Sequence, residues 1–348
     1  VNHIVSSIEA HFYDMDGDHL PEIYYNYQTA KFSNDDILSL HNRILNMAKQ
    51  AISNVVLKDI EVITPSEKAC VDEFNSRKLD YDKSESIIDI FEKNVKKFGD
   101  KKAVIFNDNS ISYDELDKRS NKVANLLVSN GIKPNDVVGV MFNRGFDIHI
   151  SLLGILKAGA SYMLIDPSLP QDRIMFMLNS SKCKVVITDL YLNYEHVSLD
   201  DASSFDESLP KVRVSNDDRF CVIYTSGSTG VPKGVELKRL GVRNLINSYI
   251  HDLNIDECNN CLSTASVAFD MFLAENFVPL LCGKTVVLAN DDEQKIPNFT
   301  SKLILKYNVD FIISTPSKIS LLLMESNCLR NVKIIQLGGE VFKPSLYN

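Results

Sequence analysis

The chain has 348 residues, of which 45% are hydrophobic and 24% are charged, and its formal net charge is −9 at pH 7. This length accommodates two or three domains. The negative charge argues against a protein that binds nucleic acid or an anionic membrane through general electrostatic attraction. Apolar runs stay well short of the roughly 20 residues that span a bilayer, and the N-terminus has no signal-peptide pattern, so we expect a cytoplasmic protein.

The seven cysteines are scattered through the chain. Only Cys258 and Cys261 have CxxC spacing, and neither a second such pair nor a nearby histidine completes a zinc site. We therefore expect reduced, structural thiols and no bound metal at these positions.

The first 65 residues predict a small α+β region. A tyrosine-rich, strand-like run covers residues 22–27, and an amphipathic helix follows from about Asp35 to Ile52, where apolar residues recur at helical spacing. Residues 66–85 are polar and charged, which is typical of a connector.

From about Ser86 onward, predicted strands and helices alternate. Ser112 and Glu115 have the spacing of a capping box, and the helix that they begin is expected to end at Gly131. The other helices predicted before the acidic middle of the chain are residues 147–158 and 171–180. The predicted strands are residues 103–106, 137–142, 161–165, 184–188, 220–224, 285–288, 310–313 and 333–337. Because apolar strands separated by helices form largely parallel sheets covered on both faces, an α/β fold is predicted.

The segment from Tyr224 to Gly234 reads YTSGSTGVPKG and directly follows an apolar strand. Its glycines permit backbone conformations in which N–H groups converge on an anion, its hydroxyls add donors, and Lys233 supplies a positive charge for phosphate oxygens. It does not match the GxxxxGK[ST] nucleotide loop, because Lys233 follows Pro232 and precedes a glycine. For a generic segment of this composition, the alternative would be a flexible polar surface loop.

At all its fixed positions, this loop resembles the phosphate-loop signature of the acyl- and aminoacyl-adenylate-forming enzymes. Further segments resemble core motifs of nonribosomal peptide synthetase adenylation domains: ISYDELDKRSNKVANLL (111–127), LLGILKAGASYMLIDPSLPQDRIMFML (152–178), FDMFLAENFVPLLCGKTVVL (269–288) and LGGE (337–340). The resemblance covers residues 84–348. It implies the N-terminal lobe of an adenylation domain, with largely parallel sheets covered by helices.

The start of the chain also carries a resemblance. LPEIYYNYQTAKFSNDDILSLHNRILNMAKQAISN (20–54) is similar to the end of a condensation domain, and VITPSEKACVDEFNSRKLDY (62–81) is similar to the linker that joins condensation to adenylation domains. The implied organisation is a condensation-domain tail at 1–65, a linker at 66–85 and a truncated adenylation lobe at 86–348. No two histidines are adjacent, so the HHxxxDG motif of condensation catalysis is absent.

The resemblance implies that the parent protein joins an α-amino acid to ATP with Mg²⁺ and passes the aminoacyl group to the phosphopantetheine thiol of a carrier domain. The implied partners are a downstream peptidyl-carrier domain and an upstream condensation domain, without nucleic acid or membrane. The residues implied in phosphate binding are Thr225, Ser226, Gly227, Ser228, Thr229, Gly230, Lys233 and Gly234, with Lys233 and Thr225 in the catalytic role. The residues implied beside the adenine are Gly338, Gly339 and Glu340.

Asp270 is implied to hold the α-ammonium group of the substrate, since a carboxylate in a mostly apolar pocket is costly unless it is paired. The alternative is that Asp270 caps a helix over residues 271–281. The side-chain pocket is implied to be lined by Met271, Ala274, Ile313, Ile335 and Leu337. All five are apolar, which favours a hydrophobic substrate side chain, although each could instead pack in the core.

The chain departs from the family pattern in two ways. It ends at Asn348, before the motif whose glutamate helps to hold Mg²⁺, the ribose-binding aspartate and the C-terminal lobe with the main catalytic lysine. The chain alone is therefore expected to be inactive. Arg239 stands where the family usually has a histidine after the phosphate loop, which would alter substrate-side contacts or matter little. Two alternative functions stay open: an aryl- or acyl-acid adenylating ligase, and a non-catalytic fragment that binds nucleotide.

Overall fold

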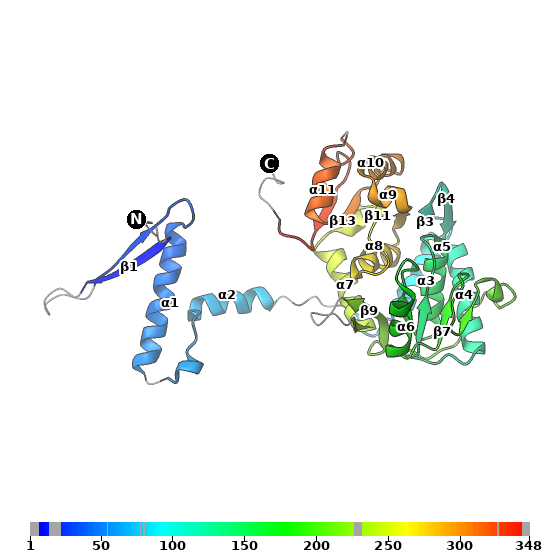
Figure 1. The fold of residues 1–348 in the computed structure, drawn as a ribbon, viewed down its shortest axis with the longest axis horizontal. Coiled ribbons are helices and arrows are strands. Elements are labelled where there is room, and N and C mark those ends of the chain that lie inside the picture. The colour runs from blue at the N-terminus through cyan, green and yellow to red at the C-terminus, as the bar shows by residue number, and fades with distance from the viewer. Residues whose placement is uncertain are drawn as a thin grey trace. The chain divides into compact units, whose positions relative to one another are not determined.

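The computed structural model describes residues 7–13, 22–53, 55–76, 78, 81–225, 232–325 and 327–342. The chain divides into two compact units, Val1–Leu79 and Asp80–Asn348 (Figure 1). In the part of the chain that is described, no helix is both long enough and apolar enough to cross a membrane.

The first unit consists of a hairpin and helices. Its elements are β1 (Ile8–Tyr13), β2 (Glu22–Tyr27), α1 (Asn34–Ile52), the short helix η1 (Leu57–Asp59) and α2 (Pro65–Asn75). β1 and β2 are antiparallel, and the Tyr25 hydroxyl on β2 lies 3.0 Å from Nδ1 of His41 on α1. The predicted strand and helix are confirmed, while the predicted connector begins as helix α2.

The first unit has almost no core of its own. Among its described residues, Ile37, at 7% exposed, is the only buried hydrophobic residue. Phe12, Leu57 and Phe74 are largely exposed. Because burial of apolar surface is the main favourable contribution to folding, the described residues of this unit gain little stability from a core of their own.

The second unit contains two sheets. The first sheet has the order β10-β9-β6-β5-β7-β8, and the second has the order β14-β13-β11-β12-β3-β4. The strands of the first sheet are β5 (Val137–Val140), β6 (Ser161–Leu164), β7 (Val185–Ile187), β8 (His196–Val197), β9 (Arg219–Thr225) and β10 (Lys233–Lys238). Those of the second are β3 (Lys102–Phe106), β4 (Asn109–Ser112), β11 (Asn260–Ser263), β12 (Thr285–Leu288), β13 (Phe311–Ser314) and β14 (Ile334–Leu337). Among the described pairings of these two sheets, only β9–β10 and β3–β4 are antiparallel, which confirms the predicted α/β fold.

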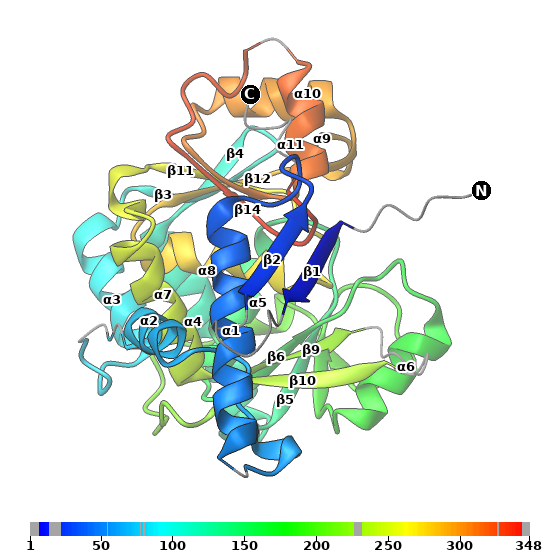
Figure 2. The same cartoon turned by 90° about the vertical axis from the view of Figure 1, so that its left-hand side faces the viewer.

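Helices cover these sheets and also lie between them. The helices are α3 (Ile87–Phe98), α4 (Tyr113–Ser129), α5 (Phe146–Lys157), α6 (Gln171–Ser180), α7 (Arg239–His251), α8 (Asp270–Leu281), α9 (Asp291–Lys295), α10 (Pro297–Lys306), α11 (Pro316–Leu323), η2 (Asp200–Ala202) and η3 (Ile255–Glu257). α5 contacts β5 and β6 of the first sheet, and α8 contacts β11, β12 and β13 of the second. Figure 2 shows α5 and α8 between the two sheets.

Local signals in the sequence account for the helix ends. The Ser112 hydroxyl accepts a hydrogen bond from the Glu115 N–H at 3.1 Å, which confirms one half of the predicted capping box, whereas the Glu115 carboxylate does not accept the reciprocal bond from the Ser112 N–H. The Glu115 carboxylate lies 3.8 Å from Arg119 on the next turn of the helix. The helix ends just before Gly131, whose φ of 79° is in the left-handed region that favours glycine.

Aromatic side chains join α8 to the first sheet. Phe277 on α8 stacks on Tyr162 of β6, with ring centroids 5.7 Å apart, and meets Phe220 of β9 edge-on at 5.3 Å. Tyr162 and Phe220 also meet each other edge-on at 5.2 Å. All three rings belong to the largest buried cluster of the unit. The packing holds β9, which leads into the phosphate loop, against the helix that begins with Asp270.

Candidate functional site

The phosphate-loop segment lies between the two strands of a hairpin. β9 and β10 pair antiparallel, with Thr225 opposite Lys233 and Tyr224 opposite Gly234. Ser226, Gly227, Ser228, Thr229 and Gly230 lie outside the described residues. The structure thus brings Thr225 and Lys233 side by side at the base of the loop, and both side chains are exposed.

Helix α6 anchors the base of this loop. The hydroxyls of Tyr224 and Ser180 lie 2.5 Å apart, and the Tyr224 hydroxyl also donates to the Met177 carbonyl at 3.2 Å. A Cβ atom at Gly234 would lie 3.1 Å from Cζ of Tyr224 and 3.2 Å from Cγ1 of Val222. Glycine at 234 therefore allows β10 to approach the anchoring tyrosine closely.

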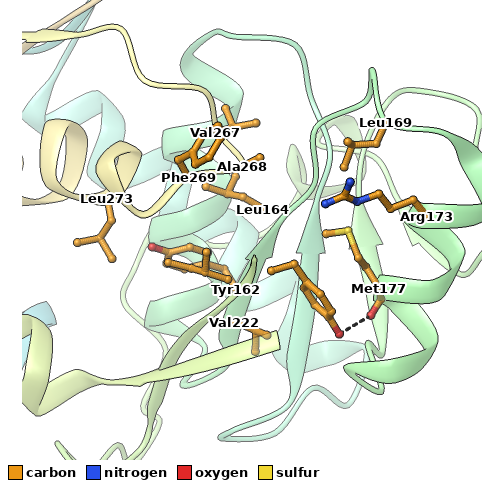
Figure 3. A pocket seen from close by; sticks show the side chains of 12 residues that line it. Tyr162, Leu164, Leu169, Arg173, Met177, Val222, Val267, Ala268, Phe269 and Leu273 are labelled. Atoms are coloured by element: carbon orange, nitrogen blue, oxygen red, sulfur yellow. Dashed lines mark hydrogen bonds between the residues drawn. The ribbon is translucent and has the colours of Figure 1, made fainter. Parts of the chain in front are cut away.

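A small pocket separates the loop base from the start of α8 (Figure 3). Its volume is about 50 Å³, and strands β6 and β9, helix α6 and the segment before α8 form its walls. The lining residues are Tyr162, Leu164, Leu169, Arg173, Met177, Val222, Ile223, Tyr224, Val267, Ala268, Phe269 and Leu273. Figure 3 shows the Arg173 guanidinium beside Met177 and Leu169. The pocket is therefore lined on one side by the strand that leads into the phosphate loop and on the other by the segment just before Asp270.

Asp270 is the first residue of α8, and Phe269 occupies the N-cap position. Its carboxylate accepts a hydrogen bond from the Met271 N–H at 2.8 Å and is exposed. A negative charge is stabilised at this end of a helix, where backbone N–H groups lack partners within the helix. Asp270 is thus an accessible carboxylate directly after Phe269, a residue that lines the pocket, and it is not the N-cap residue of α8.

The structure divides the five predicted side-chain pocket residues into two groups. Ala274 on α8 and Ile313 on β13 are 9% and 3% exposed and belong to one buried cluster, against which Met271 also packs. In the pairing of β13 with β14, Ile335 lies opposite Ile312 and Leu337 lies opposite Ser314.

This register decides which side chains share a face. Gln336, not Ile335 or Leu337, pairs with Ile313, and neighbouring residues on a strand point to opposite faces. Leu337 packs in the cluster around Ile312 on the far face of the second sheet, and Ile335 is 37% exposed. The structure therefore places Met271, Ala274 and Ile313 in or against one buried cluster and separates Ile335 and Leu337 from Ile313.

The three residues predicted beside the adenine directly follow β14. The Gly338 N–H donates to the Ser314 carbonyl at 3.1 Å, and Gly339 has a φ of 82°, which favours glycine. The Glu340 carboxylate accepts hydrogen bonds from the hydroxyl and the N–H of Ser317, which hold its pKa below the usual range. These bonds attach the turn after β14 to the start of α11.

Arg239, the departure noted in the sequence, has its side chain in the core. It is the first residue of α7 and is 0% exposed, and its Nη2 donates to the carbonyls of Ala160 at 3.0 Å and Leu156 at 3.3 Å. Burial lowers the pKa of the guanidinium to about 10. Arg239 therefore joins α7 to the end of α5 and does not contact the base of the phosphate loop.

The sequence analysis did not single out two charged residues near Asp270. Arg144 follows β5, and Glu275 lies in α8, where it is 2% exposed. Each stands in a mostly apolar run, FNRGF and MFLAENF, which is the one signal that could have marked them. Within the part of the chain that the structure describes, no group of three or more His, Cys, Asp or Glu side chains could hold a metal ion.

The family described as AMP-binding enzyme matches residues 91–348 of the chain. The chain is also similar to curated peptide synthetases. It is 31% identical over 328 residues to gramicidin S synthase 2 of Brevibacillus brevis, covering 90% of the chain and 7% of that protein. It is 33% identical over 279 residues to bacitracin synthase 1 of Bacillus licheniformis, covering 76% of the chain and 5% of that protein. It is 31% identical over 330 residues to tyrocidine synthase 3 of Brevibacillus parabrevis, covering 90% of the chain and 5% of that protein.

Solved structures share the fold. The nonribosomal peptide synthetase FmoA3 has a TM-score of 0.83 at 22% identity, over 98% of this chain and 38% of that one. The N-terminal subdomain of NpsA from Klebsiella oxytoca has a TM-score of 0.68 at 23% identity, over 76% of this chain and 70% of that one. The chain thus spans 5% to 7% of the length of the three curated relatives and 38% of FmoA3.

Proposed function

Because the chain belongs to the family of AMP-binding enzymes, we propose that it is the ATP-binding lobe of a nonribosomal peptide synthetase adenylation domain. The proposed reaction converts an α-amino acid and ATP into an aminoacyl-adenylate and pyrophosphate. The aminoacyl group then passes to the phosphopantetheine thiol of a carrier domain. The observation that carries the proposal is the β9–β10 hairpin, which holds the two ends of YTSGSTGVPKG side by side.

The residues at the base of the hairpin suit the binding of a polyphosphate. A carboxylate is a poor nucleophile beside a polyanion, so this reaction needs positive charge and backbone donors around the phosphates. Lys233 supplies an exposed ammonium group, and Thr225 supplies an adjacent hydroxyl. Mg²⁺, when bound, would neutralise further phosphate charge. In this proposal Gly338, Gly339 and Glu340 border the adenine.

The substrate class follows from the start of α8. The accessible Asp270 carboxylate would pair with the α-ammonium group of an amino acid, an interaction that an aryl or fatty acid could not make. Met271, Ala274 and Ile313 favour a hydrophobic side chain, since all three are apolar and belong to, or pack against, the same buried cluster. The proposed roles of Ile335 and Leu337 find no such support, because both lie on the opposite face of the sheet.

For the first unit, we propose the C-terminal tail of a condensation domain at residues 1–65 and a linker at 66–85. The shortage of buried apolar residues in this unit supports the proposal, because such a tail would be stabilised by the body of its own domain. The boundary between the two units, after Leu79, falls within the proposed linker. The implied neighbours are an upstream condensation domain and a downstream carrier domain.

The test is amino-acid-dependent ATP–pyrophosphate exchange, measured on the full-length polypeptide that carries this sequence. We expect one or a few apolar α-amino acids to stimulate exchange. Lys233→Ala should lower the rate by a factor of about 10² or more, as loss of a charge-stabilising donor does. Lys238→Ala, at the exposed far end of β10, is the matched control and should leave the rate unchanged. Exchange with an aryl acid alone would favour the ligase alternative, and no exchange with any acid would refute the proposed activity.

A further inference from the structure

We propose that Glu275 and Arg144 are positioning residues, which hold the segment leading to Asp270 and thereby set the affinity for the amino acid. The inference concerns residues 263–265, at the carboxyl end of β11, which we call the clamped turn. Its link to amino-acid affinity rests on the proposed function, whereas the clamp itself rests on hydrogen bonds between described residues.

Glu275 holds the N–H groups of the clamped turn. A single carboxylate oxygen, Oε2, accepts hydrogen bonds from the backbone N–H groups of Thr264 and Ala265, both at 2.7 Å. Glu275 is 2% exposed, and a backbone N–H left without a partner at such depth costs about 1–3 kcal/mol. The carboxylate therefore ties the turn to α8, the helix whose first residue is Asp270.

Arg144 holds the carbonyl groups of the same turn. Its Nη1 donates to the Ala265 carbonyl at 2.6 Å, and its Nη2 donates to the Ser263 carbonyl at 2.9 Å. Its Nε donates to the Ala289 carbonyl, just after β12, at 2.7 Å. The planar guanidinium thus joins the ends of two neighbouring strands of the second sheet, and a lysine could not make these three bonds in fixed directions.

A neutral network supports the clamp from the other side. Asn276 Nδ2 donates to the Ser263 hydroxyl at 2.9 Å and to the Phe272 carbonyl at 2.7 Å. Its Oδ1 lies 2.8 Å from Nε2 of His149 on α5. Burial lowers the pKa of His149 to about 4, so the ring is neutral at pH 7 and donates through Nε2. The clamped turn is therefore held by side chains from the β5–α5 region and from α8.

The clamp contains two charged groups of opposite sign, Glu275 and Arg144, and each shifts the pKa of the other. Burial raises the pKa of Glu275 to about 7, opposed by its bonds to Ala265 and Thr264 and by the positive charges of Arg144 and Lys318. Burial lowers the pKa of Arg144, opposed by Glu275 and Asp291. Whether the carboxyl group is ionised or neutral, its Oε2 can accept from both N–H groups.

The clamped turn is close enough to Asp270 to control its position. Only residues 266–269 separate them, and they form a tight turn in which the Phe269 N–H donates to the Ser266 carbonyl at 3.1 Å. The Ser266 hydroxyl also accepts from the Ala268 N–H at 3.3 Å. A shift of the clamped turn would therefore move Phe269 and Asp270 against the rest of the site.

The test compares Glu275→Leu with Glu275→Gln in the full-length polypeptide. Leucine removes the acceptor, whereas the glutamine Oε1 can take the place of Oε2 and accept from both N–H groups. Hydrogen–deuterium exchange, read by mass spectrometry, should become faster in residues 264–270 of Glu275→Leu and stay slow in Glu275→Gln. Leu281→Ala, which opens a cavity at the buried far end of α8, is the control for general destabilisation and should not produce this local effect.

The kinetic arm measures KM for each substrate. Glu275→Leu should raise the KM of the amino acid about tenfold or more, with the KM of ATP unchanged, because the lost contacts position only the amino-acid side of the site. Glu275→Gln should restore the amino-acid KM to within about twofold of the wild-type value. Unchanged hydrogen exchange in Glu275→Leu, or equal rises in both KM values, would overturn the inference. If the wild-type protein activates no amino acid, the proposed function fails, while the hydrogen-exchange arm still decides whether the clamp exists.

Discussion

Replacing Glu275 with glutamine should change how the stability of the protein depends on pH. Burial raises the pKa of this carboxyl from 4.5 to about 7 in the folded state. Between pH 4.5 and 7, the unfolded chain releases this proton while the folded chain keeps it, so the free energy of unfolding falls as pH rises through this window. The difference of about 2.5 pH units, at about 1.36 kcal/mol each, corresponds to about 3 kcal/mol. Glutamine has no proton to release and should abolish this loss.

The assay is urea unfolding of wild type and Glu275→Gln at several pH values from 4.5 to 8. The advantage of the variant should grow by up to about 3 kcal/mol across the window and level off above pH 7. Other titrating groups, such as Glu92, whose pKa is also raised to about 7, act equally on both proteins and cancel in the difference. A pH-independent difference for Glu275→Gln would refute the reasoning.

Three further outcomes are expected. Arg239→Met should change the free energy of unfolding, because the Arg239 side chain is buried against α5. The KM of ATP and the KM of the amino acid should stay within about twofold of the wild-type values, and a selective change in either KM would contradict this structural role. Gly234→Ala should lower the free energy of unfolding by about 1–3 kcal/mol in urea unfolding, because the added Cβ would press on Tyr224. Gly241→Ala is the control and should be tolerated, because no atom lies near the Cβ added there. Iodoacetamide should modify Cys70 first among the seven cysteines of the native protein, because Cys70 is exposed, whereas burial raises the pKa of Cys183, Cys221 and Cys282 to about 12. The labelled positions are read by peptide mass spectrometry, and early labelling of a buried cysteine would count against this packing.

The sequence was sufficient for the elements with strong local signals. Strand Glu22–Tyr27 and helix Gln171–Ser180 have the predicted bounds, and Ser112 caps α4 as expected. These features depend on alternation, helical spacing and capping chemistry, all of which act between near neighbours in the chain.

Strand β10 could not be predicted in this way. Its sequence, KGVELK, has only two apolar residues, Val235 and Leu237, and is largely exposed, so the burial that normally marks a strand is missing. It is a strand because β9 offers an edge for pairing, and that partner is recognised only when the sheet has formed.

The sequence by itself determined the α/β character of the chain and the motifs of its family, including the segments that carry Lys233 and Asp270. Tertiary structure decided where other side chains point. The register of β13 against β14 separates Ile335 and Leu337 from Ile313, since a shift of one residue exchanges the faces of a strand. Burial likewise makes Arg239 a core residue and brings Glu275 and Arg144 to one turn, because those contacts join segments far apart in the chain.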